Sequence, residues 1–315
     1  MSQSNIKNTL KKSTSESNSP ALLPFILRIK LNKLDWILLA TISVFIGWIY
    51  IQSSAGIHYQ WRWHKAIELI FSAGKPGELP YFFQGFVTTI RLSLWGMIFA
   101  GLLGLFLGLA RRSSLMILRL PAQAYIQLVR NIPPLVFVFI FYFFISSQLV
   151  PAIGLADTLR HHAGDINGLQ HFLFGSSKLW ENLFSGVLCV GLISAAYIAE
   201  IIRSGLDAIA KGQWEAADSL GLSRWSRFRD VIFPQAFAGI VPPLAGQFIS
   251  LVKDSSIISL ISIQEMTFVG SEMANSSGLI FEIWLLVGVG YLVLCLGLSL
   301  LFSRLEKRSQ RHLAR

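Results

Sequence analysis

Apolar stretches of transmembrane length are the feature that most constrains this chain. An α-helix needs roughly 20 mostly apolar residues to cross the hydrocarbon core of a membrane. Six stretches reach or approach that length: Asp35 to Ser53, Phe86 to Ala110, Pro134 to Val150, Trp180 to Ile202, Ala236 to Val252 and Ile283 to Ser303. Only 14% of the residues are charged, whereas soluble domains carry about a quarter. The sequence therefore predicts an all-α integral membrane protein with about six transmembrane helices.

The third and fifth of these spans are the shortest, and prolines bound or interrupt them. Pro133 and Pro134 lie at the start of one, and Pro242 and Pro243 lie inside the other. Between the last two spans, Ser255 to Phe268 is apolar but too short to cross, which predicts a re-entrant or interfacial segment. Spanning β-strands are the competing interpretation, but long apolar runs without alternation favour helices.

Basic residues near the spans predict the orientation, because Lys and Arg are retained on the cytoplasmic side of a membrane. They concentrate before the first span, after the second, after the fourth and in the carboxyl-terminal tail. The other loops hold few: Arg62, Lys65, Lys75, Arg160 and Lys178. Both termini are therefore predicted to lie in the cytoplasm. The same distribution assigns the net charge of +10 to anionic lipid headgroups and argues against a nucleic-acid partner.

Motifs for bond chemistry are missing from the sequence. The GKP at 74–76 lacks the upstream glycine and the Ser or Thr of a phosphate-binding loop, and HExxH, CxxC and nucleophile-elbow patterns are absent. Cys189 and Cys295 fall inside predicted spans and are interpreted as packing residues. Three histidines share one external loop: His161, His162 and His171. No Cys or carboxylate at clear ligand spacing accompanies them, so a solvated loop is favoured over a metal site. The chain is predicted to be no enzyme and to hold no metal or cofactor.

A charged segment, Gly212 to Phe237, separates the fourth and fifth spans with the sequence GQWEAADSLGLSRWSRFRDVIFPQAF. Its first part predicts a short helix, because Trp214, Ala217 and Leu220 recur at helical spacing. Gly221 follows directly, and glycine is the residue best able to adopt the left-handed backbone that ends a helix.

The second part of this segment predicts another helix. Ser223 is a candidate N-cap, Trp225, Phe228 and Ile232 form one apolar stripe, and Pro234 is expected to end or kink the helix. The helix pair is amphipathic, which suits an interfacial loop at lipid headgroups as well as a docking surface. An acidic residue followed by two alanines gives a small, smooth surface, which favours insertion into a groove of a partner protein.

EAADSLG, followed after nine residues by VIFP, resembles the cytoplasmic EAA signature of bacterial ATP-binding-cassette (ABC) importer permeases. Val231 and Phe233 stand where that signature has Ile and Leu. Three flanking stretches resemble the polar amino-acid permeases of this family: YIQLVRNIPPLVF at 125–137, SAAYIAEIIRSGLDAIAKGQWEAA at 194–217 and LVKDSSIISLISIQEM at 251–266. The resemblance covers Gly85 to Arg308.

The chain also departs from the family pattern. Asn131, Ile132 and Pro134 replace the G, T and L of the family's RGTPL, and Ser255 replaces the T of KDTSL. The first span has no counterpart in the minimal five-span members. An added span moves the amino terminus to the inside, in agreement with the distribution of basic residues.

The resemblance implies a permease subunit of the bacterial plasma (inner) membrane that carries a polar amino acid and performs no bond chemistry itself. ATP and Mg²⁺ belong to a partner ATPase, which the EAA helices contact. The resemblance assigns this coupling role to Glu215, Ala216, Ala217, Gly221 and Pro234. Further implied partners are a second permease subunit, the same or homologous, an external or periplasmic amino-acid-binding protein and membrane lipids. General, acidic and neutral amino acids are all compatible with the sequence.

The resemblance also divides the chain. We expect a disordered cytoplasmic arm at 1–33, the extra span with an external loop at 34–80, the importer permease domain at 81–308 and a cytoplasmic tail at 309–315. The permease domain contains the coupling segment at 212–234. The fold implied is a five-helix permease core with one additional amino-terminal span.

Charged and polar residues at the ends of predicted spans are functional candidates, because such residues are costly inside a membrane. They are Tyr197, Glu200, Arg203, Lys253 and Asp254. Two interpretations stay open for each charged pair, a contact with the transported amino acid and a structural ion pair. Arg91, at the outer start of the second span, is expected to reach the headgroups.

Two other functions compete with the importer permease. An ATP-independent channel or secondary carrier needs no partner ATPase, but the sequence shows no convincing inverted repeat or paired broken helices. A membrane scaffold does not account for the charges inside the predicted spans.

Overall fold

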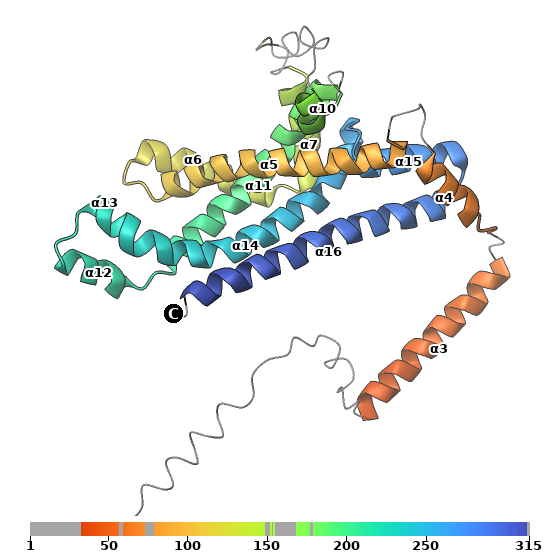
Figure 1. Ribbon diagram of the computed structural model, residues 1–315, viewed down its shortest axis with the longest axis horizontal. Helices are drawn as coiled ribbons and strands as arrows, with labels where there is room; N and C mark the ends of the chain where they lie inside the picture. Colours follow the sequence, from red (N-terminus) through yellow and green to blue (C-terminus); the bar gives the residue numbers. More distant parts are fainter. Residues whose placement is uncertain are drawn as a thin grey trace, which may run out of the picture. The chain divides into compact units, whose positions relative to one another are not determined.

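The computed structural model of the chain describes residues 33–56, 59–72, 79–148, 152, 154, 168–176 and 179–313. The secondary-structure elements within these ranges are all helical (Figure 1), which confirms the predicted all-α membrane fold. The expected arm at 1–33, apart from Lys33, lies outside the described residues, as do His161 and His162.

Five helical stretches among the described residues are long and apolar enough to cross a membrane: Lys33–Gln52, Tyr81–Arg111, Trp180–Asp207, Arg224–Ile261 and Ile280–Glu306. A sixth crossing results if the bent pair Met116–Asn131 and Pro134–Ser146 counts as one broken span. The number of spans therefore agrees with the sequence prediction.

The chain divides into two compact units, Met1–Trp61 and Arg62–Arg315. In the first, helix α3 (Lys33–Gly56) buries none of its transmembrane window within the protein, so its apolar surface is free to face lipid. The second unit contains all the other helices that the structure describes.

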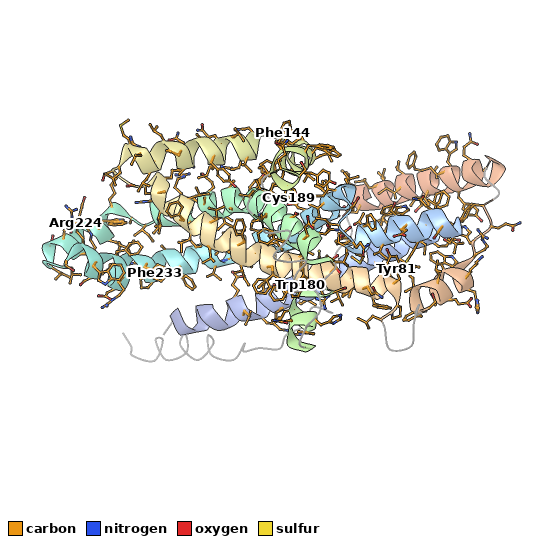
Figure 2. The ribbon with its side chains drawn as sticks, turned by 90° about the horizontal axis from the view of Figure 1, so that it is seen from above. Tyr81, Phe144, Trp180, Cys189, Arg224 and Phe233 are labelled. Carbon is orange, nitrogen blue, oxygen red and sulfur yellow. The ribbon has the colours of Figure 1, made fainter. Side chains whose placement is uncertain are left out.

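Helices α5 (Tyr81–Arg111), α11 (Trp180–Asp207), α14 (Phe233–Asp254) and α16 (Ile280–Leu313) form the body of the second unit and pack in that order (Figure 1). Figure 2 shows Arg224 and Phe233 at the end of this bundle that lies opposite Tyr81. At the Tyr81 end, α4 (Trp63–Phe71) and α15 (Met266–Ser277) pack against α5 and α16.

Small residues allow α5 and α11 to approach closely. Gly96, Ala100, Gly104 and Gly108 recur every fourth residue and form one stripe along α5, the arrangement that brings membrane helices together. A Cβ atom on Gly104 would lie 2.8 Å from the Cβ of Ile198 and 3.0 Å from the carbonyl oxygen of Ala195. The backbones of the two helices therefore touch at this stripe.

Replacing Gly104 by alanine is expected to destabilise the protein, because the added methyl group overlaps α11 and overpacking costs about 1–3 kcal/mol. Gly101→Ala is the matched control, since a Cβ at that position of the same helix meets nothing within 4 Å. Thermal unfolding of both variants in the same detergent measures the difference. Equal midpoints for the two variants would contradict the close contact.

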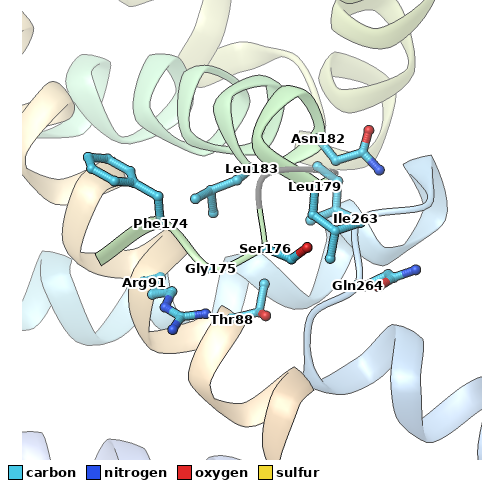
Figure 3. A pocket seen from close by; sticks show the side chains of 10 residues that line it. All are labelled: Thr88, Arg91, Phe174, Gly175, Ser176, Leu179, Asn182, Leu183, Ile263 and Gln264. Atoms are coloured by element: carbon cyan, nitrogen blue, oxygen red, sulfur yellow. The ribbon is translucent and has the colours of Figure 1, made fainter. Parts of the chain in front are cut away.

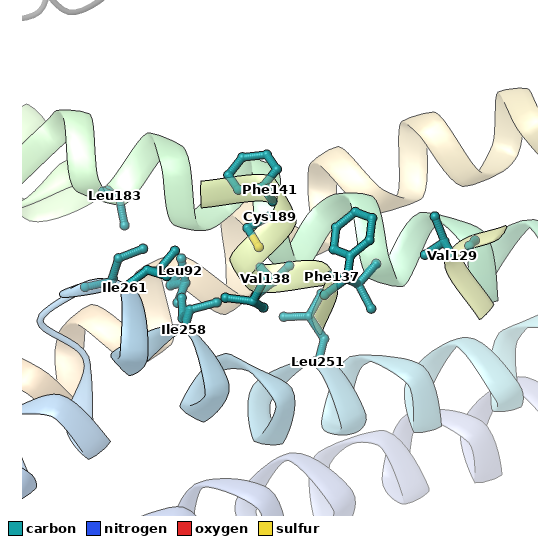
Figure 4. Packing of buried hydrophobic residues seen from close by; sticks show 14 residues of the cluster. Leu92, Val129, Phe137, Val138, Phe141, Leu183, Cys189, Leu251, Ile258 and Ile261 are labelled. Atoms are coloured by element: carbon teal, nitrogen blue, oxygen red, sulfur yellow. The ribbon is translucent and has the colours of Figure 1, made fainter. Parts of the chain in front are cut away.

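The centre of the bundle is an apolar cluster in which helices distant in sequence meet (Figure 4). Leu92 of α5, Cys189 of α11 and Leu251 of α14 are fully buried there. Phe141, also fully buried, comes from η1 (Phe141–Ser146), which continues α7 (Pro134–Ile140). Cys189 and Cys295 are free thiols, in agreement with the packing role predicted for them.

The predicted third span, Pro134 to Val150, is only the second limb of a broken helix pair. The first limb is α6 (Met116–Asn131), which sequence analysis left in the loop between the second and third predicted spans. The two limbs meet at 115°. Ile132 between them is extended (φ −88°, ψ 133°) because Pro133 follows it, and a residue before proline avoids the helical region.

The segment Ser255 to Phe268 does not cross the membrane as a helix of its own, in agreement with its length. It consists of the 3₁₀ helix η4 (Ser255–Ile261), a turn at Ser262 with φ 62°, and the start of α15. Helix α15 has 12 residues and is itself too short to span.

Candidate functional site

The segment 212–234, which we call the EAA segment, forms a helical hairpin at the Arg224 end of the bundle (Figure 2). Helix α12 (Lys211–Ser219) is followed by Gly221, whose φ of 70° is left-handed as predicted. Ser223 then caps the second helix, because its Oγ accepts a hydrogen bond of 3.1 Å from the backbone N–H of Ser226. That helix comprises α13 (Arg224–Ser226) and η3 (Arg227–Ile232).

Arg227 joins the two helices of the hairpin. Its guanidinium pairs with the carboxylate of Asp218 and lies over the ring of Trp214, 5.5 Å from the ring centroid. Gln235 adds a hydrogen bond of 3.2 Å from its Nε2 to Oε1 of Gln213. These contacts make the hairpin a rigid attachment to α14.

The two alanines of the EAA sequence face in different directions. Ala216 is exposed, together with Glu215, whereas Ala217 is 1% exposed and is the buried residue of α12. The small size of Ala217 therefore permits packing within the chain. This corrects the prediction that both alanines allow the approach of a partner.

The tip of the hairpin presents apolar side chains to its surroundings. Leu220 is 78% exposed and Trp225 is 66% exposed, and they flank Gly221 in sequence. Together with Glu215 and Ala216 they form the hairpin tip. Exposed apolar residues beside a charge are typical of protein-docking surfaces.

Pro234 does not end the helix, which was one of the two outcomes predicted for it. One continuous helical stretch runs from Arg224 to Ile261, and Pro234 occupies the first turn of α14. The π-helical turn η3 directly precedes it. A π-turn shifts the carbonyl groups that the proline ring would otherwise meet, so the helix continues. The EAA segment is thereby connected to α14 without a break.

Glu200 lies at a junction of three helices at the same end of the bundle. Its carboxylate contacts Arg111 of α5 and Arg203 of α11, and it lies 3.4 Å from a guanidinium nitrogen of Arg130 in α6. Arg130 also lies over the ring of Tyr197, 5.7 Å from the centroid. Among the described residues, Tyr197, Glu200 and Arg203 thus form one ionic network.

Asp207 extends this network by one helical turn. It accepts hydrogen bonds from Arg203 (2.6 Å) and from Arg112. Helix α11 ends at Asp207, and α12 begins four residues later at Lys211. The ionic network therefore lies where the spans meet the EAA segment.

Lys253 and Asp254 occupy the other end of α14 and do not pair with each other. Lys253 is exposed and Asp254 is half-buried, and neither forms an ion pair with a described residue. Within the part of the chain that the structure describes, Asp254 interacts electrostatically with the neighbouring Lys253, but no ion pair holds either side chain in place.

Glu265 is a buried polar residue that sequence analysis did not single out. It is 0% exposed and caps α15 by accepting a 2.8 Å hydrogen bond from the N–H of Phe268. The hydroxyl of Tyr291 donates to its carboxylate at 2.5 Å, and Thr89 lies 3.5 Å away. Glu265 thereby links α5, α15 and α16. The sequence signal that could have identified Glu265 is a single carboxylate within an otherwise apolar stretch.

Arg91 binds the end of a neighbouring helix. Its guanidinium donates to the carbonyl oxygens of His171 (3.0 Å) and Phe172 (2.8 Å), at the end of α10 (Gly168–Phe174). Gly175 is required there, because its φ is 76° and a Cβ would lie 2.7 Å from the guanidinium. The carbonyl groups at the carboxyl end of a helix have no hydrogen-bond partner within that helix, so they attract a cation such as the guanidinium of Arg91.

A small pocket lies beside Arg91 (Figure 3), lined by polar side chains such as Thr88 and Asn182 and by apolar ones such as Phe174 and Ile263. Its volume is about 40 Å³, enough for only a few water molecules. This pocket is too small for an amino acid in the conformation that the structure describes.

Comparison with known proteins relates this arrangement to a family of transporters. A family model described as binding-protein-dependent transport system inner membrane component matches residues 100–311. The chain is 34% identical over 231 residues to Probable amino-acid ABC transporter permease protein YckA of Bacillus subtilis, covering 73% of this chain and 90% of that protein. It is 31% identical over 232 residues to glutamate/aspartate import permease protein GltK of Escherichia coli, covering 74% and 95%.

The fold is also similar to a solved structure described as the crystal structure of an amino acid ABC transporter with histidines. The two chains are 30% identical, with a TM-score of 0.59. The match covers 73% of this chain and 94% of the other.

Proposed function

The chain belongs to the family of binding-protein-dependent transport system inner membrane components, and we propose that it lines the path of a polar amino acid across the membrane and docks the driving ATPase through its EAA segment. It is a permease subunit of an ABC importer. An ATP-independent channel or carrier is not favoured, because the relatives are ABC permeases. We assign no catalytic step to this chain and leave ATP and Mg²⁺ to the ATPase.

The hairpin tip is the observation that carries the docking proposal. Glu215 and Ala216 are exposed there beside Leu220 and Trp225, while Arg227 holds the hairpin rigid from within. A rigid hairpin transmits a displacement instead of absorbing it. When the ATPase closes around ATP, the EAA segment moves with it and displaces α11 and α14, to which it is joined.

The complete transporter in this proposal has two permease subunits, identical or homologous, two ATPases and an external amino-acid-binding protein. Both termini of the chain lie in the bacterial cytoplasm. Accessibility of single cysteines placed at Lys33 and Arg304 to an impermeant maleimide in intact cells tests the orientation. Labelling of either site without lysis would overturn it.

Lys253 and Asp254 are proposed to face the substrate, because neither side chain forms an ion pair in the described part of the chain. An amino acid carries the complementary ammonium and carboxylate groups. Asp254→Asn is expected to raise the half-saturation concentration for uptake about tenfold or more, the effect of losing one hydrogen bond to a charged group. Glu306→Gln, on the last span, is the control. Unchanged half-saturation in Asp254→Asn would show that Asp254 is not a substrate ligand.

Affinity purification from the native host in mild detergent tests the proposed function directly. We expect an ATPase subunit and a second permease copy or homologue to co-purify with the wild-type chain. Absence of an ATPase from well-folded preparations in several detergents would overturn the assignment. Substrate flux without ATP would then be measured next.

A further inference from the structure

Arginines outnumber carboxylates where α5, α6 and α11 meet. Four arginines, which we call the arginine cluster, share the two carboxylates of Glu200 and Asp207: Arg111, Arg112, Arg130 and Arg203. Their side chains are all partly exposed. The ion pairs within the chain therefore leave an excess of positive charge at this end of the bundle, which attracts an anion.

An apolar groove of about 350 Å³ lies between α5 and α6. Leu103, Phe106 and Leu107 of α5 line it, together with Ile117, Leu118 and Pro121 of α6. Ile117 is 80% exposed. Leu107 precedes Arg111 by four residues, or about one helical turn, so the groove approaches the arginine cluster along α5.

Arg119 is a further cation on the helix that lines this groove. It lies on α6 between Leu118 and Pro121, which both line the groove, and it is exposed. Among the described residues it has no ion-pair partner. Cationic side chains on the helices of an apolar groove match a molecule with an anionic head and an apolar tail.

We propose that this place binds one anionic phospholipid, with an acyl chain in the α5–α6 groove and the phosphate held by Arg119 and the arginine cluster. The surrounding surface favours a lipid over an acidic protein segment, because α6 also exposes Leu120 and Leu128 next to the groove. A bilayer supplies apolar chains along the whole length of such a surface. Exposed apolar residues on α6 are thereby covered, and the excess charge is neutralised in the same step.

Native mass spectrometry of the purified full-length chain, titrated with dioleoyl phosphatidylglycerol or dioleoyl phosphatidylcholine, tests the proposal. Arg119→Gln removes the positive charge of Arg119 from α6. Arg304→Gln removes that of an exposed arginine on α16, outside the groove. Arg119→Gln is expected to weaken phosphatidylglycerol binding about fivefold, the effect of one arginine near an anionic headgroup. Arg304→Gln is expected to leave it unchanged. Ile117→Ser, in the groove, should weaken the binding of both lipids.

Two results would overturn the lipid site. Equal binding of the two lipids, or equal losses in Arg119→Gln and Arg304→Gln, would mean that the charge acts only as part of the general surface. Loss of ATPase co-purification by Arg119→Gln in pure phosphatidylcholine nanodiscs would assign the arginines to an acidic protein partner instead. Neither result bears on the importer function, which co-purification of the ATPase with the wild-type chain tests separately.

Discussion

Glu215→Lys is expected to reduce ATP-driven uptake by about 30-fold or more while the protein still inserts and folds. Glu215 is exposed on α12, and no hydrogen bond or ion pair of its side chain with a described residue supports the fold. The substitution is therefore expected to act on the proposed contact with the ATPase. Reversing a charge at the centre of a protein interface costs about 2–5 kcal/mol, which corresponds to that loss of ATPase binding.

Uptake into proteoliposomes reconstituted with the ATPase and the binding protein measures this effect. Asp230→Lys is the matched control, since Asp230 is an exposed acid of the same segment that pairs only with its neighbour Arg229 among the described residues. Thermal unfolding of the permease shows that neither variant is misfolded. Normal uptake by Glu215→Lys would contradict the proposed docking role of Glu215.

Local sequence signals predicted the hairpin well because each of its parts depends on neighbouring residues. Gly221 adopts a left-handed backbone, and Ser223 caps the helix that follows it within three residues. The burial of Ala217 was not predictable in this way. It depends on the packing of α12 against η3, which only the tertiary fold brings about.

The polar contacts of Arg91 and Glu265 join residues that are far apart in the sequence, so sequence analysis did not predict them. Arg91 binds a carbonyl oxygen 81 residues away, and Glu265 lies near Thr89, 176 residues before it. Single-residue patterns carry no information about such partners. Sequence analysis also left α6 in a loop, because the ion-pair partner of its Arg130 lies on another helix. Arg130 is held by Glu200 of α11 and so is compatible with a packed helix.

The continuous helix through Pro234 shows a different limit. A proline predicts a helix break because its ring meets the carbonyl four residues earlier, here that of Asp230. The π-helical turn at Arg227–Ile232 changes that register. The expectation that proline breaks a helix assumes regular α-helical geometry. It does not apply where the turn before the proline is wider. The consequence is functional, since an unbroken helix joins the EAA segment to a span.

Glu200→Ala is expected to lower uptake and thermal stability together, because Glu200 holds arginines from three helices. Without it, Arg111, Arg130 and Arg203 face one another with only Asp207 to balance them. Breaking a buried ion pair costs about 3–5 kcal/mol, and the partial exposure of this group reduces that to about 1–3 kcal/mol. The spans then no longer move with the EAA segment.

The pattern of kinetic changes separates this role from substrate binding, the other interpretation of Glu200. A junction residue predicts a lower maximal uptake rate, a lower unfolding temperature and an unchanged half-saturation concentration. A substrate ligand predicts a raised half-saturation concentration with unchanged stability. Asp207→Asn is the control, because Asp207 is more exposed and contacts two arginines, so a smaller effect in the same direction is expected. A Glu200→Ala variant that changes only half-saturation would place Glu200 in the substrate path and refute the junction.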